Sequence, residues 1–377
     1  MKPLDIDESY LKQTLVSLLN IPSPSGYTDQ IVHYVGRELQ ELKIKFDVTR
    51  RGAIRATLPG RQSMAGRAIA VHLDTLGAMV KDLKANGRLA ISPVGTWSSR
   101  FAEGARVTIF TEEGPYRGTV LPLKASGHTF ADEVDTQPNN WDQVEIRVDE
   151  RIYQRKDLIN AGFNVGDFVA FDATPEITDN GFVNARHLDD KAGVALLMAV
   201  AKAVSQKGLV LPVSCHLIFT IAEEVGFGAS AVLYGDVAEM VVIDNATVAP
   251  GQNSWEFGVT IAMMDGAGPF DYHLTRKMID ICRDQEIEYS RDVFRHYRSD
   301  SASAIEAGND TRTALLGFGV DGSHGYERTH LSSLRSVAQL VGLYVQSPPM
   351  FDRDKDTLSS LNGFPHQPER DIIQIET

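Results

Sequence analysis

Residues 213–222 constrain the fold of this chain more than any other stretch. Their sequence, VSCHLIFTIA, is almost wholly apolar. A strand with apolar side chains on both faces is typical of a parallel sheet that is covered on both sides. Strand-like and helix-like segments alternate around it from residue 183 to residue 347. The sequence therefore predicts an α/β fold, with a mostly parallel sheet sandwiched by helices.

Residues 77–182 have a different texture. Short β-type runs, such as 106–111, are separated by Gly, Pro and Asn, a pattern typical of a small β-barrel. We expect this segment to be a domain inserted into the α/β domain. The α/β domain is then discontinuous and consists of residues 1–76 and 183–347. Residues 348–377 are polar and rich in proline, and we expect an extended C-terminal tail there.

Charge and composition narrow the class of protein. The formal net charge is −13, and a nucleic-acid backbone needs a basic surface, so nucleic acid is not an expected partner. The two cysteines, Cys215 and Cys282, stand in apolar settings and are expected to be buried thiols. The N-terminus is too polar for a signal peptide, and no run approaches the roughly 18 apolar residues of a membrane span. We expect a cytoplasmic enzyme that does not associate with membranes.

Acidic or histidine side chains stand where three predicted strands end. They are His72, Asp74, Glu223, Glu224 and Asp244. In open α/β sheets, ligands bind at the carboxyl ends of the strands. Each group also has a purely structural interpretation. His72 and Asp74 could be a surface pair, Glu223 and Glu224 a solvated strand end, and Asp244 a turn cap. Adjacent acids at the end of an apolar strand nevertheless cost desolvation energy unless a cation compensates them.

Two adjacent acids, Asp189 and Asp190, precede an apolar run of small residues at 192–204, which predicts a buried helix. Side chains one residue apart do not share a face of a helix. The pair is therefore either a helix N-cap or part of a metal site. His330 stands just before the last predicted helix, at 332–346.

Taken together, these residues predict a metal centre. Mixed histidine and carboxylate ligands suit zinc, cobalt or manganese. Two metals about 3.5–4 Å apart need a carboxylate that bridges them, and Asp189 is well placed for that role. One further carboxylate has to stay off the metals so that it can take a proton from an attacking water.

The ordered set of acids and histidines resembles the site of the glutamyl and deblocking aminopeptidases (peptidase family M forty-two, the tetrahedral aminopeptidases). The inserted β-domain narrows the match to this family. Supporting motifs extend over residues 8–347, and they are Pro24-Ser-Gly26, Gly95-Thr-Trp97, Gly162-Phe-Asn-Val-Gly-Asp167, Asp265-Gly-Ala-Gly-Pro269 and Ser299-Asp-Ser-Ala302.

The resemblance implies a role for each residue of the set. The implied metal ligands are His72, Asp189, Glu224, Asp244 and His330. His72 and Asp244 would bind one metal and Glu224 and His330 the other, with Asp189 bridging. Glu223 would then be the general base, and Asp74 would orient His72.

The resemblance also implies a cis peptide bond between the two adjacent acids. That bond would direct Asp189 toward the metals and leave Asp190 to support it from behind. The implied cofactors are two divalent ions per subunit, with zinc first and cobalt or manganese as alternatives. The implied reaction removes N-terminal residues from small peptides or dipeptide-like substrates. Family members form homo-oligomers, often dodecamers built from dimers.

The chain departs from the family pattern at three places. Lys191 replaces the usual arginine after the acid pair, Thr75 replaces a usual glutamate, and Glu327-Arg328-Thr329 precedes His330 in place of Arg-Tyr-x. These departures indicate a divergent branch, and the chain also resembles the branch linked to synthesis of the osmoprotectant N-acetylglutaminylglutamine amide. Two alternative functions stay open: a di-metal amidohydrolase or deacylase of a small N-acylated dipeptide, and a non-catalytic metal-binding assembly protein.

Three further histidines have alternative interpretations. His324, six residues before His330, is the alternative metal ligand, although a loop or specificity role is favoured for it. His187 precedes the acid pair by two residues and is interpreted as structural, with a pocket-lining role as the alternative. His216 lies within the apolar strand and is interpreted as a core histidine.

Overall fold

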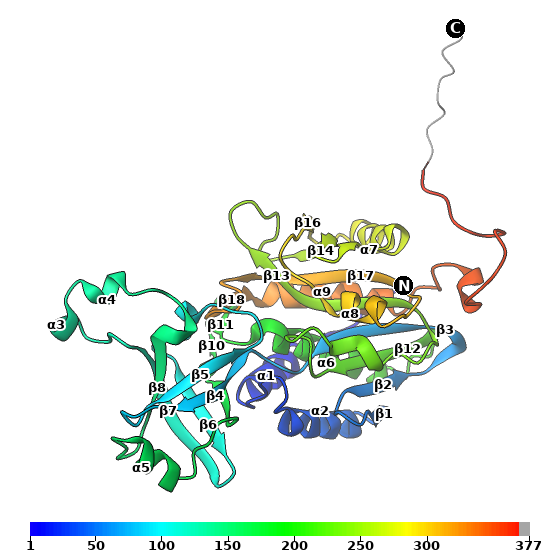
Figure 1. Ribbon diagram of the computed structural model, residues 1–377. Helices are drawn as coiled ribbons and strands as arrows, with labels where there is room; N and C mark the ends of the chain where they lie inside the picture. The colour runs from blue at the N-terminus through cyan, green and yellow to red at the C-terminus, as the bar shows by residue number, and fades with distance from the viewer. Residues whose placement is uncertain (369–377) are drawn as a thin grey trace.

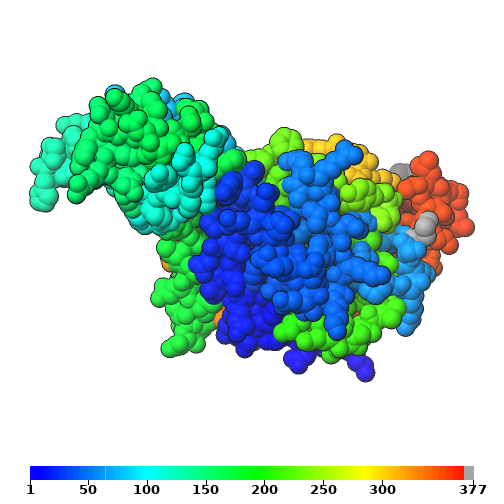
Figure 2. Space-filling model, turned by 90° about the horizontal axis from the view of Figure 1, so that it is seen from below, coloured from blue at the N-terminus to red at the C-terminus, as the bar shows by residue number. Residues whose placement is uncertain are grey.

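The computed structural model describes residues 1–368 and consists of two lobes (Figure 1). The larger lobe carries a sheet of 12 strands with helices packed on it, and the smaller lobe is a closed β-barrel. Seen from below, the barrel projects from one side of the main body (Figure 2). The predicted fold class, an α/β sheet with helices and an inserted barrel, is confirmed.

The large sheet is parallel at its centre and antiparallel toward its edges. Its main path runs in the order β1-β2-β12-β3-β13-β17-β18-β11-β10, and β3 pairs in parallel with both β12 and β13. The strands are β1 (Lys45–Val48), β2 (Ile54–Leu58), β3 (Gly60–His72), β10 (Glu176–Ile177), β11 (Phe182–Ala185), β12 (Leu211–Thr220), β13 (Val237–Val248), β14 (Val259–Asp265), β15 (Gly268–Pro269), β16 (Tyr289–Val293), β17 (Arg312–Asp321) and β18 (Glu327–His330).

Helix α6 is the most deeply buried helix of the larger lobe. Its small and apolar residues allow close approach on every side, and it packs against α1, α9 and the central strands β3 and β13. Helices α7 and α9 pack on β14 and β17, and α8 packs against η3. The helices of this lobe are α1 (Glu8–Leu19), α2 (Asp29–Glu41), α6 (Leu188–Gln206), η3 (Gly228–Ala231), α7 (Tyr272–Asp284), α8 (Asp300–Glu306), α9 (Leu331–Tyr344) and η4 (Asp352–Lys355).

The barrel closes in the order β4-β5-β8-β7-β6-β9 around its own core of buried side chains, which is separate from the core of the larger lobe. Its strands are β4 (Gly77–Leu83), β5 (Leu89–Val94), β6 (Arg106–Thr111), β7 (Gly114–Pro122), β8 (Val144–Val148) and β9 (Phe168–Phe171). Its helices are η1 (Ser99–Phe101), α3 (Gly127–Phe130), α4 (Glu133–Thr136), η2 (Trp141–Gln143) and α5 (Arg155–Asn160). The chain rejoins the large sheet at β10.

The segment after α9 is tied to the sheet by a buried ion pair. Arg67 donates to Glu239 at 3.1 Å and to the carbonyl oxygen of Ser347, and Glu239 accepts from the N–H of Met350. The last nine residues of the predicted tail, 369–377, lie outside the described residues. Both cysteines are buried and unpaired. Within residues 1–368, no helix combines the length and apolar character needed to cross a membrane.

Candidate metal centre

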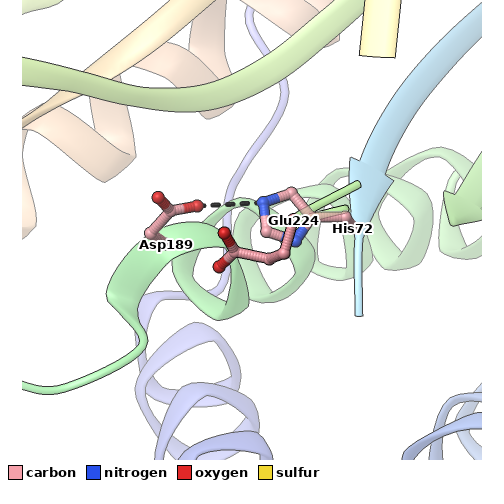
Figure 3. Close-up of side chains that lie close together, drawn as sticks. All are labelled: His72, Asp189 and Glu224. Carbon is pink, nitrogen blue, oxygen red and sulfur yellow. Dashed lines mark hydrogen bonds and ion pairs between the residues drawn. The ribbon is translucent and has the colours of Figure 1, made fainter. Parts of the chain in front are cut away.

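The candidate site lies where the parallel strands at the centre of the large sheet end. His72 is the last residue of β3, and its Nε2 lies 2.9 Å from Oδ1 of Asp189 (Figure 3). Its Nδ1 donates to the carbonyl oxygen of Asp74 at 2.9 Å, which leaves Nε2 as the nitrogen that faces the acids. Burial alone would lower the pKa of His72, but the carboxylates of Asp189 and Glu223 raise it well above its ordinary value.

The peptide bond between Asp189 and Asp190 is cis, as the family resemblance implies. Asp189 presents both carboxylate oxygens to the site: Oδ1 to His72, and Oδ2 to Nε2 of His324 at 3.3 Å. Asp190 turns behind the site, where its Oδ2 accepts from the backbone N–H of His72 at 3.1 Å. Burial raises the pKa of Asp190 well above its ordinary value, whereas the two histidines lower the pKa of Asp189 despite its burial.

Glu223 and Glu224 follow β12 and lie half-buried at the same place. One oxygen of Glu224 and one ligand atom each from His72 and Asp189 all lie within 4.8 Å of one another (Figure 3). Oε2 of Glu223 lies 4.0 Å from Nε2 of His72. Burial is the main cause that raises the pKa of both glutamates well above the ordinary value, and nearby carboxylates add to it.

Asp74 contacts the site from behind. Its carboxylate oxygens accept from the backbone N–H groups of Glu223 at 3.1 Å and Glu224 at 3.3 Å, and from the hydroxyl of Ser25 at 2.5 Å. The expected contact with His72 is made by the carbonyl oxygen of Asp74, because its carboxylate is 3.7 Å from Nδ1. Asp74 therefore fixes the backbone of the two glutamates as well as the ring of His72.

Asp244 stands within β13, one strand along from His72. The side-chain amide of Asn245 donates to Asp189 Oδ2 at 2.6 Å and to Asp244 Oδ1 at 3.2 Å, so it links the two carboxylates. Burial, with the nearby Asp189 carboxylate, raises the pKa of Asp244 to about 8. The prediction that a strand ends at Asp244 is wrong, because β13 continues to Val248. Asn245 is a site residue that sequence reasoning missed, although its position directly after Asp244 was a usable signal.

His324 occupies the place at which His330 was predicted. It follows β17, with a backbone φ of 65°, and its Nε2 lies 3.3 Å from Asp189 Oδ2 and 3.8 Å from Glu224 Oε2. Burial alone would lower the pKa of His324, but the Asp189 and Glu224 carboxylates raise it to about 10. His324, the alternative ligand predicted from the sequence, is the histidine that the fold brings to the acids.

The prediction that His330 completes this cluster is wrong. His330 ends β18 and caps α9, where its Nδ1 accepts from the backbone N–H of Ser332 at 3.1 Å. Its Nε2 lies 2.8 Å from the carbonyl oxygen of Asn180 and so has to donate. The ring packs against Phe182 and Phe257, with 4.9 Å between ring centroids in both pairs. Both nitrogens are thus engaged away from the acids.

Glu327 is a further residue that sequence reasoning missed. Its Oε1 accepts from the backbone N–H of His324 at 2.9 Å, and its Oε2 accepts from that of Asp189 at 3.1 Å. Burial and the Asp189 carboxylate raise the pKa of Glu327 to about 8. The spacing His324-x-x-Glu327, just after a central strand, was the signal that would have favoured His324 over His330.

The acids line a cleft of about 1030 Å³ to which both lobes contribute. The barrel contributes one wall through residues 95–98 and Phe101, and the larger lobe contributes residues 225–227 and 294–299. The candidate-site residues that line the cleft are Asp189, Glu223, Glu224, Asp244 and His324. Asp74 and Asp190 lie behind them.

The charge of this group fits divalent metal ions. Within residues 1–368, no lysine or arginine forms an ion pair with Asp189, Glu223, Glu224 or Asp244. The two histidines, His72 and His324, are too few to balance these four carboxylates, and buried carboxylates left without a cation carry a large desolvation cost. Imidazole nitrogens and carboxylate oxygens together are a suitable donor set for zinc, cobalt or manganese. The residues therefore fit a metal centre.

Comparison with known proteins identifies the family. The sequence profile described as M42 glutamyl aminopeptidase matches residues 52–340. The chain belongs to the M42 glutamyl aminopeptidase family. The predicted family is thereby confirmed. Membership of this family also confirms the predicted class of activity, that of an aminopeptidase.

Relatives and solved structures agree with this membership. The chain is 39% identical over 337 residues to "Putative aminopeptidase YhfE" of Bacillus subtilis (strain 168), covering 89% of this chain and 97% of the relative. The fold is similar to that of the TET aminopeptidase from a marine sediment archaeon, Thaumarchaeota archaeon SCGC AB-539-E09 (TM-score 0.81, 17% identity, 90% and 96% of the two chains). It is also similar to that of the Pyrococcus horikoshii TET1 peptidase (TM-score 0.79, 21% identity, 89% and 99%).

Proposed function

We propose that this M42 protein is a two-metal aminopeptidase that removes residues from the N-terminus of peptides. One observation carries the proposal: two histidines face the two oxygens of a single carboxylate. His72 Nε2 lies 2.9 Å from Asp189 Oδ1, and His324 Nε2 lies 3.3 Å from Asp189 Oδ2. Such a carboxylate can offer one oxygen to each of two metals about 3.5–4 Å apart, with one histidine beside each metal.

The remaining acids divide between the two positions. We assign His72 and Asp244 to one metal, His324 and Glu224 to the other, and Asp189 to both. The position of Glu224 Oε2, 3.8 Å from His324 Nε2, supports its place in the second set. Asp190 keeps its contact with the His72 backbone and supports the pair from behind. Zinc is the proposed metal, with cobalt and manganese as alternatives.

Glu223 is the proposed general base. Bound metals would lower the pKa of a water and polarise the carbonyl of the scissile peptide bond. Glu223 lies in the cleft beside this position and has no ligand role in the assignment above. Its carboxylate accepts a proton from the attacking water and passes it to the leaving nitrogen, while the hydroxyl forms the new bond to carbon and the C–N bond breaks. The acidic side chains that line the cleft favour a substrate with a free, positively charged α-amine.

Glu223→Gln tests this proposal against the alternatives. The variant is expected to retain two metals per chain, measured by elemental analysis, and to lose about 10²–10⁴-fold in kcat on aminoacyl anilides. The same panel includes small N-acylated dipeptides. Cleavage of only the acylated substrates by the wild-type protein would replace the aminopeptidase with a deacylase, and unchanged rates in Glu223→Gln would remove Glu223 as the base.

The assembly is also a proposal. The structurally similar TET1 peptidase of Pyrococcus horikoshii can assemble into a tetrahedron or a large octahedral shell. We propose that the present chain forms a homo-oligomer, with a dodecamer as the first candidate. Light scattering on the purified protein measures the mass directly, and a monomer at working concentration would contradict the proposal. The link to the osmoprotectant branch stays a prediction.

A further inference from the structure

A short segment of the barrel lobe, residues 95–101 after β5, lies at the proposed metal site, where five of its residues line the cleft. The carbonyl oxygen of Thr96 accepts a hydrogen bond from Nδ1 of His324 at 2.9 Å. This bond joins the two lobes, because Thr96 belongs to the barrel and His324 to the turn after β17. The inserted lobe therefore supplies the hydrogen-bond acceptor for Nδ1 of His324.

The segment is held firmly on the barrel side. The Trp97 ring packs edge-on against Trp141 and Phe171, with 4.8 Å between ring centroids in both pairs. Its Nε1 donates to the carbonyl oxygen of Gly77 at 3.2 Å, and its own carbonyl oxygen accepts from Nε1 of Trp141 at 3.2 Å. The carbonyl group of Thr96 is thus fixed by the residue that follows it.

The segment also fits closely against the larger lobe. A Cβ on Gly95 would lie 2.5 Å from Cδ2 of the buried Leu76 side chain, so either that side chain or the segment has to shift to admit it. At its other end, the Phe101 ring lies against the turn that carries His324, since a Cβ on Gly325 would be 3.1 Å from Phe101 Cδ1. Contacts at both ends of the segment therefore fix its position relative to the site.

We propose that Thr96 is a positioning residue for His324, so that the seating of the inserted barrel sets the affinity of one of the two metal positions. The inference rests on the proposed two-metal function. A carbonyl oxygen only accepts, so its bond to Nδ1 keeps a proton on that nitrogen and leaves Nε2 as the nitrogen that faces Asp189 and Glu224 and that would bind a metal after losing its own proton. Partners of this kind commonly alter metal affinity by about 10–100-fold when they are removed.

Two glycines of the barrel provide a matched pair of variants. Gly95 has φ 84° and Gly104 has φ 77°, so an alanine is similarly strained at both positions. The surroundings differ, because a Cβ at Gly104 has nothing within 4 Å. Gly95→Ala should therefore displace Thr96, whereas Gly104→Ala should carry only the backbone cost.

The test is a titration of the metal-free full-length protein with Co²⁺, followed by calorimetry and by visible absorption. Wild type and Gly104→Ala are expected to bind two Co²⁺ per chain with equal affinities. Gly95→Ala is expected to weaken one of the two sites by about 10–100-fold and to change its absorption. The weakened site should be the one that is lost in His324→Asn, a variant that tolerates the positive φ of this position.

A second route for an effect of Gly95→Ala runs through the backbone of Glu224, because the added Cβ would lie 3.4 Å from the Glu224 carbonyl oxygen. Trp97→Phe separates the two routes, since it loosens the Thr96 segment without adding an atom beside Glu224. Weakened Co²⁺ binding in Gly95→Ala but not in Trp97→Phe would overturn the inference, and so would unchanged binding in Gly95→Ala. A wild-type protein that binds no Co²⁺ pair would instead contradict the proposed function.

Trp97→Phe is the second variant if Gly95→Ala does not fold. It removes the bond from Nε1 to the Gly77 carbonyl oxygen and keeps most of the ring packing. A smaller weakening of the same Co²⁺ site, about 3-fold, is expected from a loosened segment. Identical titration curves for Trp97→Phe and wild type would contradict the positioning role of Thr96.

Discussion

Two regions that each carry a histidine flank the short strand β18, and the two histidine rings have different partners. The turn before the strand carries His324, whose Nε2 faces Asp189 and Glu224. The junction after the strand carries His330, whose ring contacts Asn180, Ser332 and two aromatic side chains. One histidine has a nitrogen directed at buried acids, and the other caps a helix.

The difference follows from the strands that precede the two regions. His324 follows β17, which pairs in parallel with β13 and places Gly317 opposite Asp244. His330 ends β18, which runs antiparallel to β11 and leads the chain away from that edge. A histidine can reach the acids only if its strand belongs to the parallel centre of the sheet. The spacing of the two histidines along the sequence does not decide this.

The largest expected effect separates the two histidines by activity. His324→Asn should lower kcat/KM on aminoacyl anilides by about 100-fold or more, because loss of one metal removes several kcal/mol of transition-state stabilisation. His330→Asn should stay within about 3-fold of wild type, since asparagine also caps a helix. Elemental analysis should find half the metal in the first variant and all of it in the second. The opposite ranking would restore His330 as the ligand.

A pH dependence of intermediate size is expected from the His324 region. The pKa values of Asp244 and Glu327 are raised to about 8, so the folded metal-free protein holds protons that the unfolded chain releases near pH 4. The stability that these protons confer is fully present below about pH 4 and is lost as the pH rises through about 8. Melting temperatures of the metal-free protein should therefore fall between pH 5 and pH 8.5, by more than about 4 °C.

Bound metal should reverse this trend. Metals need the ionised carboxylates, so their affinity rises with pH over the same range. Scanning calorimetry with and without added Zn²⁺ checks both slopes, and His330→Asn should show the same two slopes as wild type. A melting temperature of the metal-free protein that rises from pH 5 to pH 8.5 would contradict the assigned pKa directions.

The smallest expected effect concerns stability at the second region. His330→Ala removes the side chain that accepts from the N–H of Ser332 at the start of α9. Loss of such a cap costs about 1 kcal/mol, which corresponds to a fall of roughly 2 °C in melting temperature. His330→Asn should recover most of that loss, and both variants should bind the same amount of metal. A change in metal content in either variant would place His330 in the site.

Much of the fold and of the site could be predicted because several site residues directly follow segments that the sequence marks as strands. The apolar stretch at 213–222 predicted a buried strand, and Glu223 and Glu224 follow it directly. His72 ends its strand as expected, and the acid pair begins α6. In each case local pattern and tertiary position coincide, so periodicity and strand ends were sufficient.

The rest of the site depends on contacts between segments that are far apart in the sequence, and no local pattern predicts those contacts. The choice between His324 and His330 required the direction of β18, which is too short to carry a clear pattern. The bond from His324 to Thr96 joins positions 228 residues apart in two lobes. The contact of Asp74 with the backbone of the two glutamates likewise appears only once β3 and β12 lie side by side.

A crystal structure with anomalous data at the metal edges tests the two-metal assignment most directly. We predict two peaks per chain, one beside His72 and Asp244 and one beside His324 and Glu224, with Asp189 in contact with both. A single peak, or a peak bound to His330, would contradict the assignment.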